Sequence, residues 1–198
     1  MSDYVAVPHA IFKGYRNVTL SVDVMFVNRI PFLTSISRHL KFITAETLHN
    51  RTTIQLVQCV KNAKALYTKR GFNVATAIMD GELVPMRTAL LNMGVSLNTA
   101  SASEHVPEIE RKNRVVKERA RACHHSLPFK TIPRIMIKEM IYNCVLWINA
   151  FPPKVGVSAS ISPCTLLTGV KFNYNCHCKL AWDYGSRNAT FWREGVNP

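Results

Sequence analysis

The chain has 198 residues, enough for one domain with a sizeable core, and its hydrophobic content of 47% excludes a disordered polymer. Its 25 Lys and Arg residues against 12 Asp and Glu residues give a formal net charge of +13 at pH 7. This excess favours a polyanionic partner such as nucleic acid. Ribosomal and membrane-surface proteins share the same signature, so the charge selects a class of partner and not a reaction.

Residues 1–17 are a mixed segment that predicts no clear element. Over residues 18–27 apolar side chains alternate with others, which predicts a strand with Asp23 near its middle. Two further strands are expected over residues 31–37 and 40–46. The short connections between these three strands favour an antiparallel meander.

The spacing of apolar residues changes to a helical period over residues 47–70. Residues 72–79 are largely apolar without strict alternation, as in a central parallel strand that helices cover. Asp80 follows that strand directly, and the carboxyl end of a buried strand is where α/β proteins commonly place their chemistry. A short helix over residues 85–93 and a last strand over residues 95–99 are expected next.

The stretch of residues 105–123 predicts an amphipathic helix that begins near Pro107. One stripe of this helix is predicted to face the core, and it consists of Ile109, Asn113, Val116, Ala120 and Cys123. The next stripe consists of Glu110, Arg114, Lys117 and Arg121, so the helix has a core side and a basic side. A solvated charged face is the commoner explanation of such a pattern, but two acids earlier in the chain favour a functional one.

Another helix is expected over residues 136–150, and a short one within residues 158–169. Ser162 is the predicted N-cap of the short helix, with Pro163 at its first position. Residues 182–198 match no element.

The six cysteines are too few and too irregularly spaced for a disulfide scaffold, which favours a reducing environment. Cys59, Cys123 and Cys144 lie in apolar helical patterns, where a free thiol packs as a small hydrophobe. The Cys and His clusters at 123–125 and 176–178 lack the paired spacing of a zinc site.

The early sequence has no secretory signal, because Lys13, Arg16 and Asp23 interrupt its only apolar region. The most apolar later run, residues 141–151, is too short to cross a bilayer. We therefore expect a soluble, intracellular protein that is neither secreted nor inserted in a membrane.

Three acids, Asp23, Asp80 and Glu110, are candidates for one site. Each has a structural explanation of its own: an outward strand residue, a turn former before a glycine, and a first-turn acid that offsets the helix dipole. Acids on the first strand, after the fourth strand and at the start of a helix can nevertheless converge at one edge of a mixed sheet.

Three such carboxylates can hold two Mg²⁺ or Mn²⁺ ions, which would clamp the attacking and leaving oxygens of a phosphoryl transfer. The predicted contacts to the phosphodiester backbone are the basic residues behind Glu110, namely Arg111, Lys112, Arg114, Lys117 and Arg121.

The motifs around these acids resemble a known family. SVDVMF contains Asp23, AIMDGE contains Asp80, and EIERKNRVVKERARAC contains Glu110. Together they resemble the three acidic motifs of retroviral and retrotransposon integrase catalytic cores. The ERKNR run is similar to the signature helix of the copia type in particular, and SPCTLLTGVKF resembles the segment that follows the core in copia polyproteins.

The resemblance implies a ribonuclease H-like α/β fold: a mixed five-stranded sheet, made of an antiparallel meander plus parallel strands, flanked by helices. The core domain would span residues 18–151, with residues 1–17 as a lead-in segment and residues 152–198 as an irregular C-terminal extension. The chain would then be a fragment of a retrotransposon polyprotein.

The same resemblance implies that Asp23, Asp80 and Glu110 form a metal-binding catalytic triad with a two-ion Mg²⁺ or Mn²⁺ site. The implied activity is DNA integration, by 3′-processing and strand transfer. Its partners would be DNA, as element ends and target DNA, and further copies of the chain in a homo-oligomer. The location would be the nucleus or a cytoplasmic particle.

Two other functions stay open. The interval between Asp80 and Glu110 is shorter than the family normally has, which motivates a catalytically inactive, nucleic-acid-binding remnant. A ribonuclease H-type nuclease acting on RNA–DNA hybrids would use the same fold and the same metals.

Overall fold

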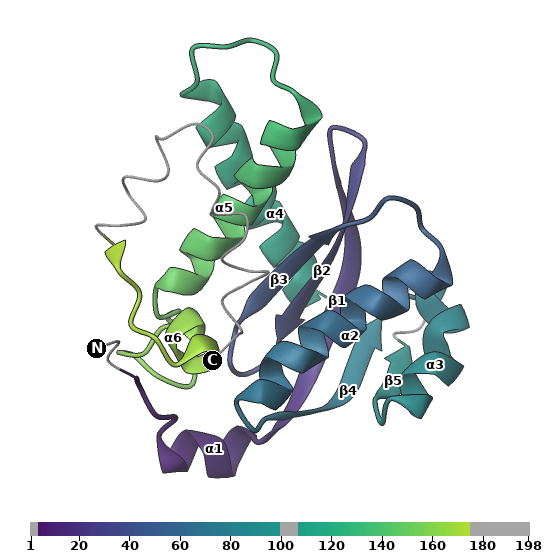
Figure 1. Ribbon diagram of the computed structural model, residues 1–198, viewed down its shortest axis with the longest axis vertical. Helices are drawn as coiled ribbons and strands as arrows, with labels where there is room; N and C mark the ends of the chain where they lie inside the picture. Colours follow the sequence, from purple (N-terminus) through teal and green to yellow (C-terminus); the bar gives the residue numbers. More distant parts are fainter. Residues whose placement is uncertain (1–3, 100–106, 175–198) are drawn as a thin grey trace.

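The computed structural model describes residues 4–99 and 107–174, and its strands form one five-stranded mixed sheet (Figure 1). The strands are β1 (Asn17–Val27), β2 (Ile30–Ser37), β3 (Ile43–Thr47), β4 (Asn73–Met79) and β5 (Ser96–Thr99). The order across the sheet is β3-β2-β1-β4-β5. β1, β2 and β3 form an antiparallel meander, while β4 is parallel to β1 and β5 is parallel to β4. The predicted combination of a meander with parallel strands is confirmed.

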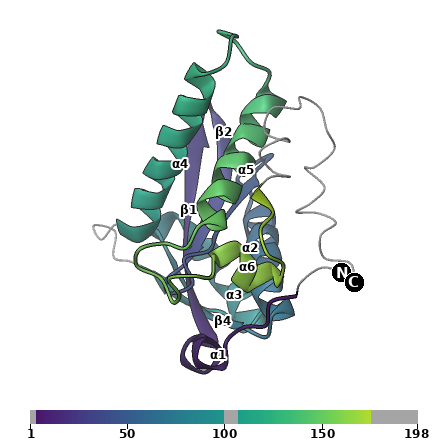
Figure 2. The ribbon, with the colours of Figure 1, turned by 90° about the vertical axis from the view of Figure 1, so that its left-hand side faces the viewer.

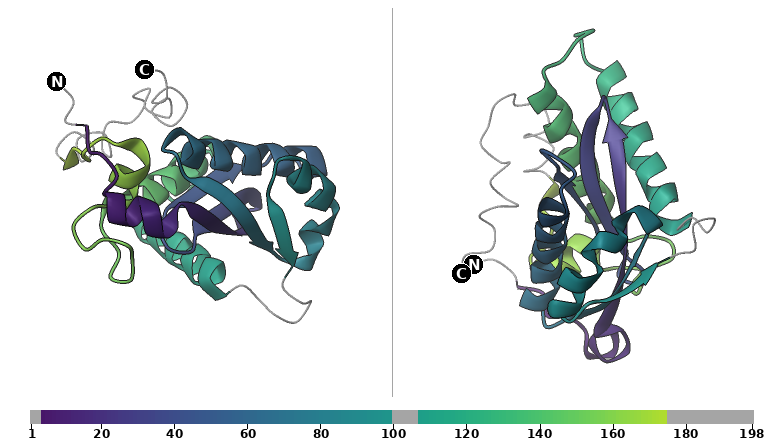
Figure 3. Two further views of the ribbon diagram at one scale, coloured as in Figure 1. Left: turned by 90° about the horizontal axis from the view of Figure 1, so that it is seen from below. Right: turned by 90° about the vertical axis from the view of Figure 1, so that its right-hand side faces the viewer.

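Helices cover both faces of the sheet, with α2 on one face and α4 on the other (Figure 3). The helical elements are α1 (His9–Tyr15), α2 (Thr53–Lys69), the 3-10 helix η1 (Gly81–Met86), α3 (Arg87–Asn92), α4 (Pro107–His125), α5 (Arg134–Ala150) and α6 (Pro163–Thr168). In the part of the chain that the structure describes, no helix has the length and apolar character needed to span a bilayer.

The two faces of β1 belong to two different hydrophobic cores. Leu20 and Val22 pack in the core under α2, and Met25 packs in the core under α4 and α5. Successive side chains of a strand point to opposite faces, so Asp23 lies on the same face as Met25. The first acid of the predicted triad therefore faces α4.

Two element boundaries differ from the prediction because of local hydrogen bonding. The helix predicted over residues 47–70 begins at Thr53, since Thr47 pairs with Phe32 as the last residue of β3. Between these elements, the side chain of Gln55 accepts hydrogen bonds from the backbone of His49 and Asn50, which stabilises a turn. β3 itself begins only at Ile43, after a turn that follows β2.

Two further differences concern short helices. The helix predicted over residues 85–93 is split into η1 and α3, with Pro85 inside the 3-10 segment. α1 was not predicted at all, because seven residues with a single buried side chain, Ile11, carry almost no periodic signal.

The predicted capping of α6 is confirmed. Ser162 Oγ accepts a 3.1 Å hydrogen bond from the backbone N–H of Thr165, and Gly169 ends the helix with a φ of 77°. Leu166 and Leu167 of α6 pack in the core under α2, so this helix contributes to the same core as the sheet.

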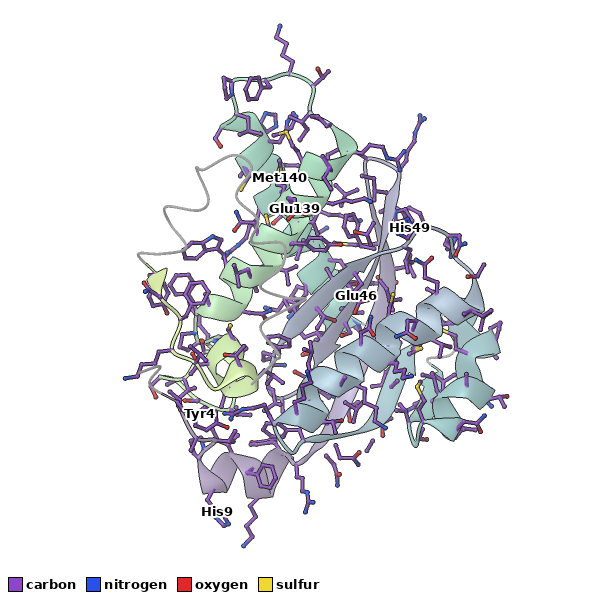
Figure 4. The ribbon with its side chains drawn as sticks, viewed as in Figure 1. Tyr4, His9, Glu46, His49, Glu139 and Met140 are labelled. Carbon is purple, nitrogen blue, oxygen red and sulfur yellow. The ribbon has the colours of Figure 1, made fainter. Side chains whose placement is uncertain are left out.

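One guanidinium connects α2, α6 and the N-terminal segment. Arg70, directly after α2, donates through Nε to the backbone oxygen of Leu166 (3.0 Å) and through Nη2 to that of Val5 (2.8 Å). Its Nη1 donates to the hydroxyl of Tyr4, the residue labelled in Figure 4, and the guanidinium carbon lies 4.9 Å from the centre of the Tyr4 ring. All three nitrogens of this guanidinium therefore donate hydrogen bonds to α6 or to the N-terminal segment.

Candidate active site

A groove of about 430 Å³ lies between β1 and α4. β1 contributes Asp23, Val24 and Met25 to its lining. α4 contributes a mixture of acidic, amide and basic side chains, namely Glu110, Asn113, Arg114, Lys117, Glu118 and Arg121. Residues far apart in the sequence, Asp23 and Glu110, thus line one groove together with three of the predicted DNA-binding residues.

The groove exists because β1 is longer than its parallel neighbour. The pairing of β1 with β4 ends at Val22 and Met79, whereas the pairing of β1 with β2 continues to Val27. Within the described part of the chain, residues 23–27 therefore pair with a strand on one side only. The open edge begins at Asp23, and α4 packs across the face of the sheet beside it (Figure 2).

Asp23 is half-buried, and both of its carboxylate oxygens accept hydrogen bonds. Oδ1 accepts from the backbone N–H of Val24 (2.7 Å), and Oδ2 accepts from Nδ2 of Asn113 (2.7 Å). Thr34 Oγ1 lies 2.9 Å from Oδ1 of Asn113 and 3.1 Å from the backbone oxygen of Asp23, so its one proton is shared between two acceptors. The carboxylate is thereby held in one orientation by a strand and a helix.

Asn113 is the site residue whose role the sequence did not reveal. Its position in the core-facing stripe of α4 was predicted correctly, and it is 6% exposed. The signal that could have identified its role is the amide itself, because a buried polar side chain in an apolar stripe needs a hydrogen-bonding partner.

Asp80 lies at the same end of the sheet as Asp23 but outside the lining of the groove. It directly follows Met79, the last residue of β4, whose partner Val22 precedes Asp23 on β1, so the two acids occupy corresponding positions just after the last β1–β4 pair. The side chain of Asp80 is exposed, and its Oδ1 accepts a 2.6 Å hydrogen bond from the backbone N–H of Gly81 as the N-cap of η1.

The donor set at this end of the sheet consists of hard oxygen ligands. Asp23 and Glu110 line the groove, Asp80 directly follows the neighbouring strand β4, and among the described residues neither His nor Cys contributes to the lining. Carboxylate oxygens suit Mg²⁺ and Mn²⁺ and disfavour softer metals. Within residues 4–99 and 107–174, no three His, Cys, Asp or Glu side chains are gathered closely enough to hold an ion. The residue types fit a divalent metal, and the side chains are not preassembled around it.

The five predicted DNA-binding residues fall into two groups. Arg114, Lys117 and Arg121 line the groove, whereas Arg111 and Lys112 do not.

Lys112 lies on the other flank of α4, beside an ion pair between Lys41 Nζ and Glu108 Oε1 (2.5 Å). Burial, and then the positive charge of Lys41, lower the pKa of the Lys112 amine. Lys112 therefore lies on a different flank of α4 from Arg114, Lys117 and Arg121, whose shared stripe with Glu110 was predicted from the helical period.

The prediction that Cys123 packs in the core is wrong. Ile109, Val116 and Ala120 are buried as expected, but Cys123 is exposed. The last turns of α4 extend beyond the sheet (Figure 2), so the stripe that is buried lower on the helix has no sheet to cover it there. The cluster at 176–178 lies outside the described residues.

The sheet order, its mixed pairing and the helices on both faces define a ribonuclease H-like fold of the kind found in integrase catalytic cores, as predicted. Solved structures with this arrangement include the catalytic core domain of BIV integrase. Its TM-score is 0.53 at 14% sequence identity, and the match covers 82% of this chain and 97% of that chain. A second is the HTLV-2 integrase catalytic core domain, in complex with magnesium and in a trimeric form. Its TM-score is 0.55 at 12% sequence identity, and the match covers 76% of this chain and 96% of that chain. No protein-family model and no curated protein matches the sequence.

Proposed function

We propose that this chain is a metal-dependent polynucleotidyl transferase of the integrase type, from a copia-type retrotransposon polyprotein. Its reactions would be 3′-processing of element ends and transfer of the new DNA end into target DNA. The observation that carries this proposal is the groove in which Asp23 and Glu110 lie with Arg114, Lys117 and Arg121. The fold shared with the BIV and HTLV-2 integrase cores supports it.

Asp23, Asp80 and Glu110 are the residues that would hold Mg²⁺ or Mn²⁺. When bound, two such ions activate the attacking oxygen and stabilise the leaving oxygen of an in-line phosphoryl transfer. The chain's own contribution is orientation: Asn113 and Thr34 fix the Asp23 carboxylate. The magnesium in the HTLV-2 core supports the same choice of metal for this chain.

The basic residues of the groove would hold the DNA backbone. Arg114, Lys117 and Arg121 flank the acids on α4, where they can pair with phosphate oxygens on either side of the scissile bond. Arg111 and Lys112 lie outside the groove, so in this proposal they add to the general attraction for DNA and do not position the reacting phosphate.

The test is cleavage of a labelled DNA duplex by the full chain in Mn²⁺ and in EDTA. Nicking that requires Mn²⁺ and is abolished by Asp80→Asn supports the proposal. Glu139→Gln, which removes the same charge from α5 outside the groove, is the matched control and should retain activity. Nicking that persists in Asp80→Asn would refute the assigned site.

A catalytically inactive DNA-binding protein is the second candidate, favoured by the observation that the acids are not gathered around a metal position among the described residues. It predicts DNA binding without nicking in either wild type or Asp80→Asn. An RNA–DNA hybrid included in the same assay distinguishes both of these functions from that of a ribonuclease H-type nuclease. Such a nuclease would cut the hybrid and leave the DNA duplex intact.

The quaternary state and location are proposals of the same kind. The HTLV-2 core is described in a trimeric form, which supports self-association of this chain as a homo-oligomer. Light scattering of the purified protein measures this directly. DNA integration further requires access to DNA, so we place the protein in the nucleus or in a cytoplasmic particle.

A further inference from the structure

Two thiols from different helices meet at the far end of α4. The side chain of Cys123, in the last turn of α4, is hydrogen-bonded to the side chain of Cys144 on α5. Cys123 is exposed, whereas Cys144 is 5% exposed in the core under these two helices. Both are free thiols. The pair therefore combines one sulfur that solvent reaches with a second one directly behind it.

The surroundings of the two thiols give them different reactivity. Burial, and then the neighbouring Cys123, raise the pKa of the Cys144 thiol to about 12, so that Cys144 is protonated at neutral pH. Arg119 acts in the opposite direction and favours the Cys144 thiolate. Because oxidants attack accessible thiolates, the first reaction falls on Cys123.

We propose that Cys123 and Cys144 are a site of reversible oxidation by a peroxide, with a disulfide between α4 and α5 as the product. The Cys123 thiolate attacks one oxygen of hydrogen peroxide, the O–O bond breaks, and a sulfenic acid and hydroxide form. The sulfur of Cys144 then attacks the sulfenic sulfur, the S–O bond breaks, and hydroxide leaves. With the two thiol protons, each hydroxide becomes water, so two thiols lose two electrons and one peroxide is reduced.

The other described cysteines lack this arrangement. Cys59 is buried, with a side-chain hydrogen bond to Glu46, and Cys164 is buried, with a side-chain hydrogen bond to Thr168. Burial is the main cause that raises the pKa of Cys59 to about 12 and that of Cys164 to about 11. Neither has the access that makes Cys123 the first target, so the oxidation is selective within the described residues.

The disulfide has a structural consequence. It closes a loop of about 20 residues and fastens the free end of α4 to α5, which should raise the melting temperature by roughly 5–10 °C. The groove lies on α4, so the modification stiffens the helix that lines the candidate active site. The proposal itself does not depend on the function of that site.

The experiment treats the reduced full chain with a small excess of hydrogen peroxide, blocks remaining thiols with N-ethylmaleimide, and maps peptides without reduction. We expect a linked pair of peptides containing Cys123 and Cys144, which dithiothreitol separates. In Cys144→Ser, Cys123 should instead accumulate as a sulfenic acid that dimedone traps. Cys59→Ser, a buried cysteine on another helix, is the matched control and should form the link as wild type does.

Two results would overturn the proposal. One is recovery of Cys144 as a free, alkylated thiol in wild type after Cys123 has been oxidised. The other is a link from Cys123 to Cys176 or Cys178 in place of Cys144. Because the wild-type protein gives the decisive measurement, neither result depends on whether a variant folds.

Discussion

Nδ2 of Asn113 on α4 lies 2.7 Å from Oδ2 of Asp23 on β1, and this hydrogen bond joins the helix to the middle strand of the sheet. The bond is made to a charged acceptor by a side chain that is 6% exposed, so it is stronger and more directional than a bond at the surface. The helix that carries Glu110 is thereby held at a fixed position relative to the strand that carries Asp23.

Replacing Asn113 should therefore destabilise the protein. Asn113→Ala leaves Oδ2 of Asp23 without its donor, and we expect the free energy of unfolding to fall by about 2 kcal/mol. Urea denaturation at pH 7 measures this. Asn92→Ala, at an exposed position at the end of α3, is the control and should change stability little. Equal effects of the two substitutions would show that the bond contributes nothing.

Thr34 should be coupled energetically to Asn113. Thr34→Val keeps the shape of the side chain but removes the shared hydroxyl proton, so Asn113 Oδ1 and the Asp23 backbone oxygen lose a donor. We expect a loss of about 1–2 kcal/mol. The double variant Thr34→Val, Asn113→Ala should lose less than the sum of the single variants, because they share one network. Strict additivity in a double-mutant cycle would exclude that network.

Two lysines on opposite flanks of α4 should differ in DNA binding. Lys117→Ala removes a cation that lines the groove and should reduce the slope of log affinity against log salt by about 1. Lys112→Ala removes the same charge from the flank beside Lys41 and should change the slope less. Fluorescence anisotropy with a labelled duplex at several salt concentrations gives both slopes. A larger effect at Lys112 would place the DNA on the other flank.

Glu118 should restrict metal-free DNA binding. Among the described residues, the lining of the groove holds three acids and three bases, so their formal charges cancel until cations bind. Glu118→Gln should therefore raise the affinity for DNA in EDTA several-fold, with a smaller gain in Ca²⁺. Glu139→Gln changes the net charge equally outside the groove, and it should have little effect. If both variants bind DNA equally well in EDTA, net charge and not the groove is responsible.

The stability of the protein should depend on pH through Glu46, which lies on β3 beside α2 (Figure 4). Burial raises the pKa of this carboxyl, although a hydrogen bond from Asn62 opposes the shift. The folded state therefore binds the proton more tightly than the unfolded state, and stability falls as pH rises above the unfolded pKa of about 4.3.

Glu46→Gln removes this cost and keeps an oxygen for Asn62. We expect its melting temperature to exceed that of wild type by a few degrees at pH 7. Near pH 4 the melting temperatures of the variant and the wild type should become equal. Thermal melts followed by circular dichroism across this range measure the difference. A constant difference at all pH values would attribute the effect to packing.

The sequence predicted the parts of the fold that depend on periodicity. The alternation over β1 and the core stripe of α4 each depend on contacts along one face, so the spacing of apolar residues predicts them. β4 was predicted instead from a largely apolar run, which suits a strand covered on both faces. α1 was not predicted, and the helix predicted over residues 85–93 did not show the start of η1 at Gly81 or its 3-10 form, because short elements carry too little periodic signal.

The candidate site was predictable as a set of residues but not as an arrangement. The proximity of Lys112 to Lys41 depends on how α4 packs beside a residue that is remote in the sequence. The exposure of Cys123 depends on where the sheet ends relative to the helix. The bond between Asn113 and Asp23 depends on the crossing of α4 over β1. Each is a tertiary relationship that no local pattern encodes.

The three acceptors of Arg70, on Leu166, Val5 and Tyr4, all lie outside residues 18–151. A chain trimmed to that interval would leave this cation without any of them and would expose the apolar surface that α6 now covers. Any shorter version of the protein prepared for biochemical work should therefore keep the residues from Tyr4 onward and those through Val170, which bridge one another across the two ends of the described fold.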